Sequence, residues 1–256
     1  ALREDRAAGW LPFCIVATVG TTSTTSIDPV PEISRIARRE RVWLHIDGAY
    51  GGIAAVVPEL RWVLAGSEHA DSLVVNPHKW LLTPIDCSAF YVQQPRILKQ
   101  AFSLSPEYLR TDDGNVKNFM DYGVQLGRRF RALKLWFVIR SYGAEGLAQI
   151  IREHCALARE FGGWVDEHPA FERIAPIPFS TVCFRCHPKE MDDETDLERI
   201  NAAILEEVNA GGEVFLSHTR LRNAYVLRIA IGNQATRRTH VARAWELLQQ
   251  AAAKHY

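Results

Sequence analysis

The sequence predicts an α/β protein with a largely parallel sheet, followed by a smaller α/β unit. Between residues 12 and 92, short apolar runs alternate with segments of helical spacing, which is typical of strand–helix–strand units. Polar residues stand directly after these runs, where the carboxyl ends of parallel strands bind ligands. After Pro176 and Pro178 a new series of strand and helix patterns begins, which indicates a second unit.

The first unit is expected to contain four strands and two short helices. The run at residues 12–20 (PFCIVATVG) is apolar and β-branched, as buried strands are. The charged segment at residues 1–9 resembles the end of a helix with a glycine stop. The other expected strands cover residues 42–46, 73–75 and 87–92, and the helices cover residues 31–41 and 58–65.

The segment at residues 102–125 lacks periodicity, and a loop of this length in a compact domain is usually functional. Two amphipathic helices are expected next, at residues 127–142 and 146–167. We therefore divide the chain into a large domain, residues 1–145, and a small carboxy-terminal domain, residues 146–256. Later elements are expected at residues 179–184 (strand), 194–209 (helix), 214–216 (strand), 225–231 (strand) and 239–252 (helix).

The composition argues against several classes of function. The 256 residues are 47% hydrophobic and 23% charged, with a formal net charge of zero and no basic block, so no nucleic-acid partner is expected. No apolar run reaches the roughly 18 residues of a membrane span. The five cysteines are scattered and odd in number, which favours a reducing compartment. We therefore expect a cytoplasmic protein without a membrane partner.

Asp47 and Lys79 are the first candidates for chemistry, because each closely follows a predicted strand of the same sheet. A lysine in this position can become a nucleophile, and a carboxylate nearby can hold a protonated heterocyclic nitrogen. Pyridoxal 5'-phosphate (PLP) chemistry requires such a pair. A surface lysine and a capping aspartate are the alternative, since both are common at strand ends.

Three sequence blocks stand out: residues 17–22 (ATVGTT), 43–52 (WLHIDGAYGG) and 76–82 (NPHKWLL). They resemble the group II PLP-dependent amino acid decarboxylases, and among these the aromatic-L-amino-acid decarboxylases. Segments 126–134 and 242–246 match the same family. The resemblance covers essentially the whole chain. It implies the PLP-dependent transferase fold (fold type I), with this chain as the second half of the large, mostly parallel-sheet domain plus the small carboxy-terminal α/β domain.

The resemblance also implies roles for individual residues. Lys79 is expected to carry PLP covalently, and Asp47 is expected to pair with the nitrogen of the cofactor ring. Ala49 is expected to pack against one face of the ring. His78 and Asn76 are expected to reach the phosphate, although His78 taken alone is an ordinary loop histidine.

Thr22 and Tyr108 complete the implied site. Thr22 is expected close to the cofactor, although a turn residue is the simpler interpretation. Tyr108, within residues 105–109 (SPEYL), resembles the tyrosine of the family's mobile catalytic loop, which helps to return a proton to the substrate carbon after CO2 leaves. Relatives with phenylalanine there act as aldehyde synthases, so Tyr108 favours simple decarboxylation. The alternative for Tyr108 is a packed loop aromatic.

A Cys-x-x-Cys-His pattern at residues 183–187 fits covalent haem attachment or half a zinc site. No second pair of ligands follows it. The segment also has the pattern of a strand, which would place Cys183 and Cys186 on opposite faces. Buried thiols are therefore expected here, and no metal.

The resemblance implies decarboxylation of an aromatic L-amino acid to its amine and CO2. Trp80, directly after the lysine, favours the branches that act on aromatic amino acids or histidine, and the choice among tryptophan, tyrosine, phenylalanine, dopa and histidine stays open. The alternatives are an aldehyde synthase, which adds oxidative deamination, and a non-catalytic fragment.

The family's first half is not recognisable in these residues, and the chain begins with Ala1 rather than Met. We therefore expect the chain to require an amino-terminal segment, as a separate fragment or chain, because half a parallel sheet leaves unpaired edges and an exposed apolar face. The resemblance implies a homodimer of complete subunits.

Overall fold

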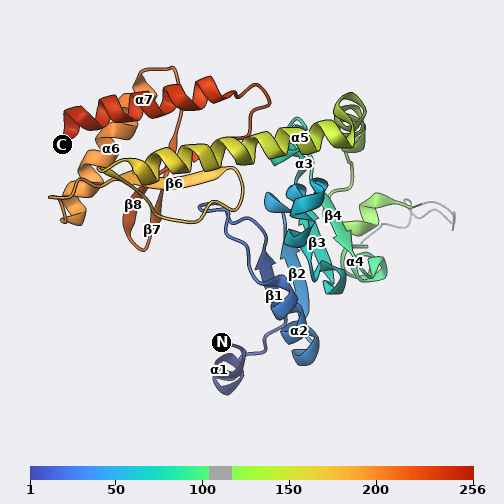
Figure 1. The fold of residues 1–256 in the computed structure, drawn as a ribbon. Coiled ribbons are helices and arrows are strands. Elements are labelled where there is room, and N and C mark those ends of the chain that lie inside the picture. The colour runs from blue at the N-terminus through green and yellow to red at the C-terminus, as the bar shows by residue number, and fades with distance from the viewer. Residues whose placement is uncertain (104–116) are drawn as a thin grey trace.

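The computed structural model describes residues 1–103 and 117–256. These residues form two four-stranded sheets, and one long helix, α5 (Arg131–Glu167), runs past both of them (Figure 1). The prediction of an α/β chain with two successive sheets is confirmed.

The first sheet has the order β1-β2-β3-β4. Its strands are β1 (Cys14–Thr18), β2 (Trp43–Asp47), β3 (Ser72–Val75) and β4 (Ala89–Val92). The first three are parallel and β4 is antiparallel, so the predicted largely parallel sheet is confirmed. Helix α2 (Val30–Glu40) connects β1 to β2. A proline in its first turn favours its start, because the fixed φ of proline suits that position.

The two faces of this sheet differ in burial. Leu44 and Ile46 of β2 point into a core that 3-10 segments and α5 complete. The opposite face is more open, because Val16 of β1 remains 57% exposed and Phe90 of β4 remains 50% exposed. Strand register places Asp47 on this open face, next to Val74 and in line with Phe90.

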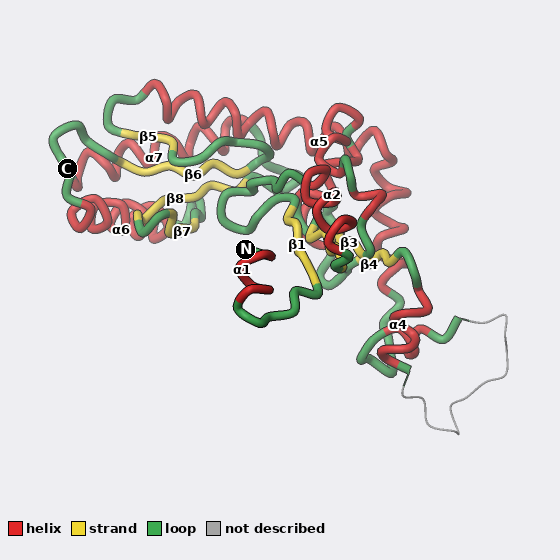
Figure 2. The backbone as a smooth tube through the Cα atoms, turned by 90° about the horizontal axis from the view of Figure 1, so that it is seen from below, coloured by secondary structure: helices red, strands yellow, loops and turns green. Residues whose placement is uncertain are grey.

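The second sheet is antiparallel throughout, in the order β5-β6-β8-β7. Helices α5, α6 (Glu194–Ala210) and α7 (Arg238–His255) contribute to a single core with it (Figure 2). Helix α6 begins at a side-chain cap, since Asp193 accepts hydrogen bonds from two backbone N–H groups of the first turn. The strands are β5 (Phe171–Arg173), β6 (Thr181–Cys186), β7 (Ser217–Leu221) and β8 (Ala224–Ala230).

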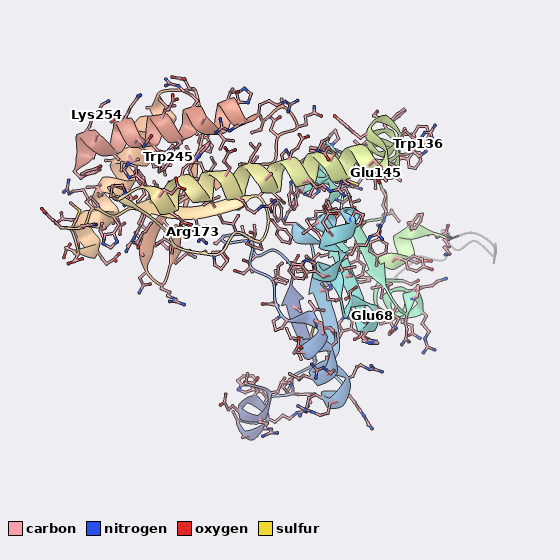
Figure 3. The ribbon with its side chains drawn as sticks, in the orientation of Figure 1. Glu68, Trp136, Glu145, Arg173, Trp245 and Lys254 are labelled. Atoms are coloured by element: carbon pink, nitrogen blue, oxygen red, sulfur yellow. The ribbon has the colours of Figure 1, made fainter. Side chains whose placement is uncertain are left out.

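Helix α5 belongs to both cores. Gly143 interrupts it with φ 67° and ψ 173°, so the two predicted helices are confirmed as two segments of one element, although the first begins at Arg131 rather than at Gly127. Trp136 and Glu145 lie towards the first sheet, whereas Trp245 of α7 packs beside the far end of α5 (Figure 3). Ile151 packs into the first core and Phe161 into the second. The domain boundary after residue 145 stays a prediction.

One predicted strand is wrong in position. Residues 214–216 were expected to form it, but the strand β7 covers 217–221. Leu216 is held outside the ladder by Asn209, whose side chain accepts from its N–H at 2.8 Å and donates to its carbonyl at 3.0 Å. The remaining helices are α1 (Leu2–Ala7), α3 (Pro77–Trp80) and α4 (Pro95–Phe102). No helix of the described residues is long and apolar enough to span a membrane.

Candidate active site

Strands β1, β2 and β3 end at the same edge of the first sheet. Thr18 is in register with Asp47, and Asp47 is in register with Val74. Because the three strands are parallel, the loops that follow them meet at this edge. The edge therefore collects Thr22 from the first loop, Asp47 at the end of the second strand and the segment 76–80 from the third.

Backbone hydrogen bonds join the loop after β2 to the loop after β3. Gly48 donates its N–H to the carbonyl of Val74 at 3.0 Å, and Asn76 donates its N–H to the carbonyl of Ala49 at 3.1 Å. The Asp47 carboxylate accepts from the N–H of Ala49 at 3.0 Å, which orients it at the end of β2. Ala49 itself is almost fully buried. The segments that carry Asp47 and Lys79 are thus directly hydrogen-bonded to each other.

Lys79 lies in the one-turn helix α3 between two anchored neighbours. The His78 ring approaches the backbone of Cys87, with Nδ1 at 2.7 Å from the carbonyl oxygen and 3.1 Å from the amide nitrogen. Trp80 is 1% exposed. Lys79 is exposed, so its backbone is held on both sides while its amine is free to reach a ligand.

Trp80 also connects the two loops through its ring. It stacks on Tyr50 with centroids 4.9 Å apart and an interplanar angle of 7°, and it meets Phe179 edge-on at 5.6 Å. Tyr50 in turn is hydrogen-bonded to Ser180, at 2.8 Å between the hydroxyl oxygens. Burial raises the pKa of Tyr50, so its hydroxyl stays neutral. Trp80 therefore packs the loop after β2 against the segment that carries Lys79.

The residues at this edge fit PLP. A carboxylate ends β2, an exposed amine follows the neighbouring strand β3, and the small residue Ala49 lies in the loop hydrogen-bonded to that of the amine. Asn76 has a buried side-chain oxygen, Oδ1, without a hydrogen-bond partner among the described residues. Buried polar atoms normally have such a partner. The Asn76 amide therefore has hydrogen-bonding capacity left for a bound molecule.

Thr22 and Tyr108 are the remaining predicted site residues. Thr22 is exposed in the loop after β1, four residues beyond Thr18, where that strand ends. Tyr108 lies outside the described residues. The structure therefore brings the segments of Asp47, Ala49 and Asn76 to one edge with those of His78, Lys79 and Thr22.

Sequence reasoning missed a clamp from the second sheet onto the loop after β1. Arg228 donates from Nε to the carbonyl of Ser23 at 2.9 Å, and Thr219 donates to the Ser23 hydroxyl at 3.0 Å. Cys183 lies 3.3 Å from the same carbonyl. These partners are 160 to 205 residues away from Ser23 along the chain, so no local pattern could have indicated them.

The cysteine pair does not form a metal site. Cys183 faces Ser23 of the first unit, whereas Cys186 is buried in the second core, which confirms their expected positions on opposite faces. Burial raises the pKa of Cys186 to about 12 and also raises that of Cys183, so both are thiols at neutral pH. The described part of the chain holds no group of three potential metal ligands.

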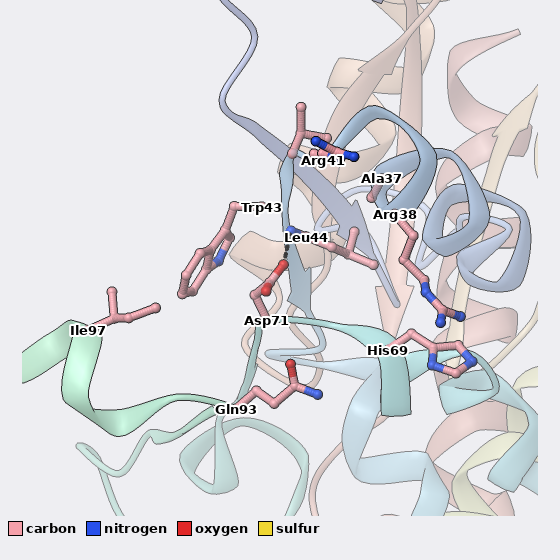
Figure 4. Close-up of a pocket in the computed structure, with 10 residues that line it drawn as sticks. Ala37, Arg38, Arg41, Trp43, Leu44, His69, Asp71, Gln93 and Ile97 are labelled. Atoms are coloured by element: carbon pink, nitrogen blue, oxygen red, sulfur yellow. Dashed lines mark hydrogen bonds between the residues drawn. The ribbon is translucent and has the colours of Figure 1, made fainter.

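A cavity of about 530 Å³ opens at the opposite edge of the sheet, where β2 and β3 begin (Figure 4). Its lining includes Arg38, Trp43 and Asp71. The Asp71 carboxylate already accepts a hydrogen bond from the N–H of Leu44 at 2.8 Å. This cavity is a strand's length away from Asp47, so it is separate from the candidate site.

The fold is that of PLP-dependent enzymes of fold type I. Residues 1–187 match the family model described as the pyridoxal-dependent decarboxylase conserved domain. The chain therefore belongs to the pyridoxal-dependent decarboxylase family, and the predicted family is confirmed.

Relatives support the same assignment. The chain is 45% identical to a tryptophan decarboxylase of Camptotheca acuminata over 255 residues, which are 98% of this chain and 51% of that protein. It is 43% identical to a phenylacetaldehyde synthase of Arabidopsis thaliana, covering 99% of this chain and 52% of the relative. The crystal structure of Oryza sativa TDC with PLP and tryptamine superposes with a TM-score of 0.94 at 38% identity, covering 99% of this chain and 53% of that one. The chain thus spans about half the length of the relatives it matches.

Proposed function

We propose that this chain supplies Lys79 and Asp47 to a PLP site that decarboxylates an aromatic L-amino acid to the corresponding amine. The observation that carries the proposal is the direct connection between the loops of Asp47 and Lys79 at the carboxyl edge of the sheet. A non-catalytic role would not require a free amine and an oriented carboxylate on neighbouring loops.

Each residue has a defined task in this proposal. The Lys79 amine attaches the cofactor, and the Asp47 carboxylate stabilises a proton on the ring nitrogen. When bound, PLP supplies a conjugated ring that accepts the electron pair left by departing CO2. Ala49 limits the space on one ring face, and His78 and Asn76 contribute to holding the phosphate. Thr22 borders the site from the loop after β1.

The substrate class follows from the relatives. One of them is a tryptophan decarboxylase, and the rice structure contains tryptamine, the amine that corresponds to tryptophan. We therefore assign the substrate to the aromatic L-amino acids. Tyr108, outside the described residues, is assigned the return of a proton to the substrate carbon.

An aldehyde synthase is the second candidate, because a phenylacetaldehyde synthase is 43% identical to this chain. That reaction consumes O2 and water, and it releases the aldehyde, CO2, ammonia and hydrogen peroxide. Product analysis separates the two functions: an amine alone supports decarboxylation, whereas aldehyde, ammonia and peroxide in equal amounts support the synthase.

The site is completed by another part of the protein. The open face of the first sheet carries Asp47 together with exposed Val16 and Phe90, and the start of α5 exposes Trp136 and Phe137. Apolar surface of this kind marks an interface. We propose that the chain corresponds to the carboxy-terminal half of its relatives, that an amino-terminal half covers this face, and that complete subunits form a cytoplasmic homodimer.

Reduction of the native enzyme with borohydride, followed by peptide mapping, tests the proposal. We expect a pyridoxyl adduct on Lys79 and none on Lys254, a control lysine at the end of α7 (Figure 3). Lys79→Arg keeps the positive charge but should form no adduct and lose activity. Amine production by an enzyme whose Lys79 is unmodified by borohydride would overturn the assignment.

A further inference from the structure

His154 of α5 makes a buried connection to the turn that carries Lys79. Its ring is 2% exposed, and Nδ1 accepts a hydrogen bond from the indole Nε1–H of Trp80 at 3.1 Å. The other ring nitrogen, Nε2, lies 3.1 Å from the backbone carbonyl of Asn233, in the loop between β8 and α7. A small-domain loop, α5 and the Lys79 turn are therefore connected through one imidazole.

The two hydrogen bonds determine the state of this ring. The indole can only donate and the carbonyl can only accept, so His154 is neutral with its proton on Nε2. Burial lowers the pKa of His154, which keeps the ring neutral at neutral pH. Both nitrogens have partners, so the ring is held in one orientation.

The Lys79 turn depends on contacts of this kind. Helix α3 is a single turn, and so short a helix has little stability of its own. Its geometry is set by the anchored rings of His78 and Trp80 on either side of Lys79. Without the His154 acceptor, the buried indole N–H has no partner, which favours a displaced Trp80 ring. The neighbouring lysine would then move with it.

We propose that His154 is a positioning residue for Lys79, acting through Trp80. This inference rests on the proposed function, since it assumes that the Lys79 amine carries the cofactor. His154 touches neither substrate nor cofactor in this proposal. It fixes the direction from which the lysine reaches the edge of the sheet.

Variants of the native holoenzyme test the role of the acceptor. His154→Leu removes it, whereas His154→Asn places an amide oxygen near the former Nδ1. Trp80→Phe deletes the donor and keeps an aromatic ring on Tyr50. We expect His154→Leu and Trp80→Phe to lower kcat at least about tenfold, because small displacements of a reacting group are costly. KM should change less, and His154→Asn should recover most of kcat.

The matched control is His168→Leu. His168 follows the end of α5, its Nδ1 also accepts a hydrogen bond, and its ring packs on Phe171 and Trp245 in the other core. This variant should lose stability but keep the kcat of its folded fraction and the absorbance maximum of the lysine-bound cofactor. His154→Leu should shift that maximum, and the double variant with Trp80→Phe should be no worse than either single variant.

The outcomes separate this inference from the proposed function. Absence of a Lys79 adduct in the unchanged enzyme contradicts the proposed function and removes the basis of the inference. A normal adduct in the unchanged enzyme, with His154→Leu and Trp80→Phe matching its kcat and absorbance, overturns the positioning role alone. Equal effects of His154→Leu and His168→Leu on kcat and absorbance also overturn it. If His154→Leu does not fold, the kcat and absorbance maximum of Trp80→Phe are compared with those of His168→Leu, and equal values overturn the positioning role.

Discussion

Replacing Gly20 with alanine should destabilise the protein at the edge that carries the candidate site. Gly20 has a φ of +87°, and a Cβ there would lie 2.9 Å from the backbone nitrogen of Gly51 and 3.2 Å from Cδ1 of Tyr50. The left-handed conformation costs a residue with a Cβ about 1–2 kcal/mol. Overpacking against backbone adds about 1–3 kcal/mol. The expected loss in the free energy of unfolding is therefore about 2–5 kcal/mol.

Gly212→Ala is the control for this change. Gly212 has a φ of +72°, and nothing lies within 4 Å of a Cβ built there. Gly212→Ala should therefore lower the free energy of unfolding only by the cost of the left-handed conformation, about 1–2 kcal/mol. Urea unfolding of both holoenzyme variants, followed by circular dichroism, measures the difference. If Gly20→Ala is no less stable than Gly212→Ala, the contact between the loops of Gly20 and Gly51 is not tight and the reasoning is refuted.

Two further substitutions test contacts between distant segments. The hydrogen bond from Arg152 lowers the pKa of Glu59 to about 2 from an ordinary value of 4.5. The pair therefore stabilises the folded protein fully at pH values above 4.5, and this contribution is lost as the pH falls towards 2. The difference in Tm between the unchanged protein and Glu59→Gln should shrink over that range, and a constant difference would contradict it. Arg228→Met removes the hydrogen bond to the Ser23 carbonyl and should cost about 1–3 kcal/mol with faster release of PLP, measured by urea unfolding and by dialysis. Unchanged stability and retention would show that this clamp is dispensable.

Local patterns were sufficient to predict most elements, and together with the family resemblance they indicated the candidate site. The alternation of buried and half-buried residues in β2, with Leu44 and Ile46 inward, is the kind of signal that a sequence carries by itself. The positions of Asp47 at the end of one strand and of Lys79 after another were equally visible. Parallel strands bring those positions to a common edge, so their proximity followed from the element order.

Positions that depend on long-range contacts could not be predicted in the same way. The strand β7 begins later than its apolar residues suggest, because Asn209 captures the backbone of Leu216. The antiparallel direction of β4 depends on which strand it pairs with, and its residues alone do not encode that choice.

The sequence by itself determined the family, the element order and the two residues on which the proposed chemistry depends, because motifs and periodicity are local properties of the chain. Only the tertiary structure decided how the Lys79 turn is held. Trp80 meets Tyr50 and His154 across 30 and 74 residues, and such partners are chosen by packing and hydrogen-bond geometry in the folded protein.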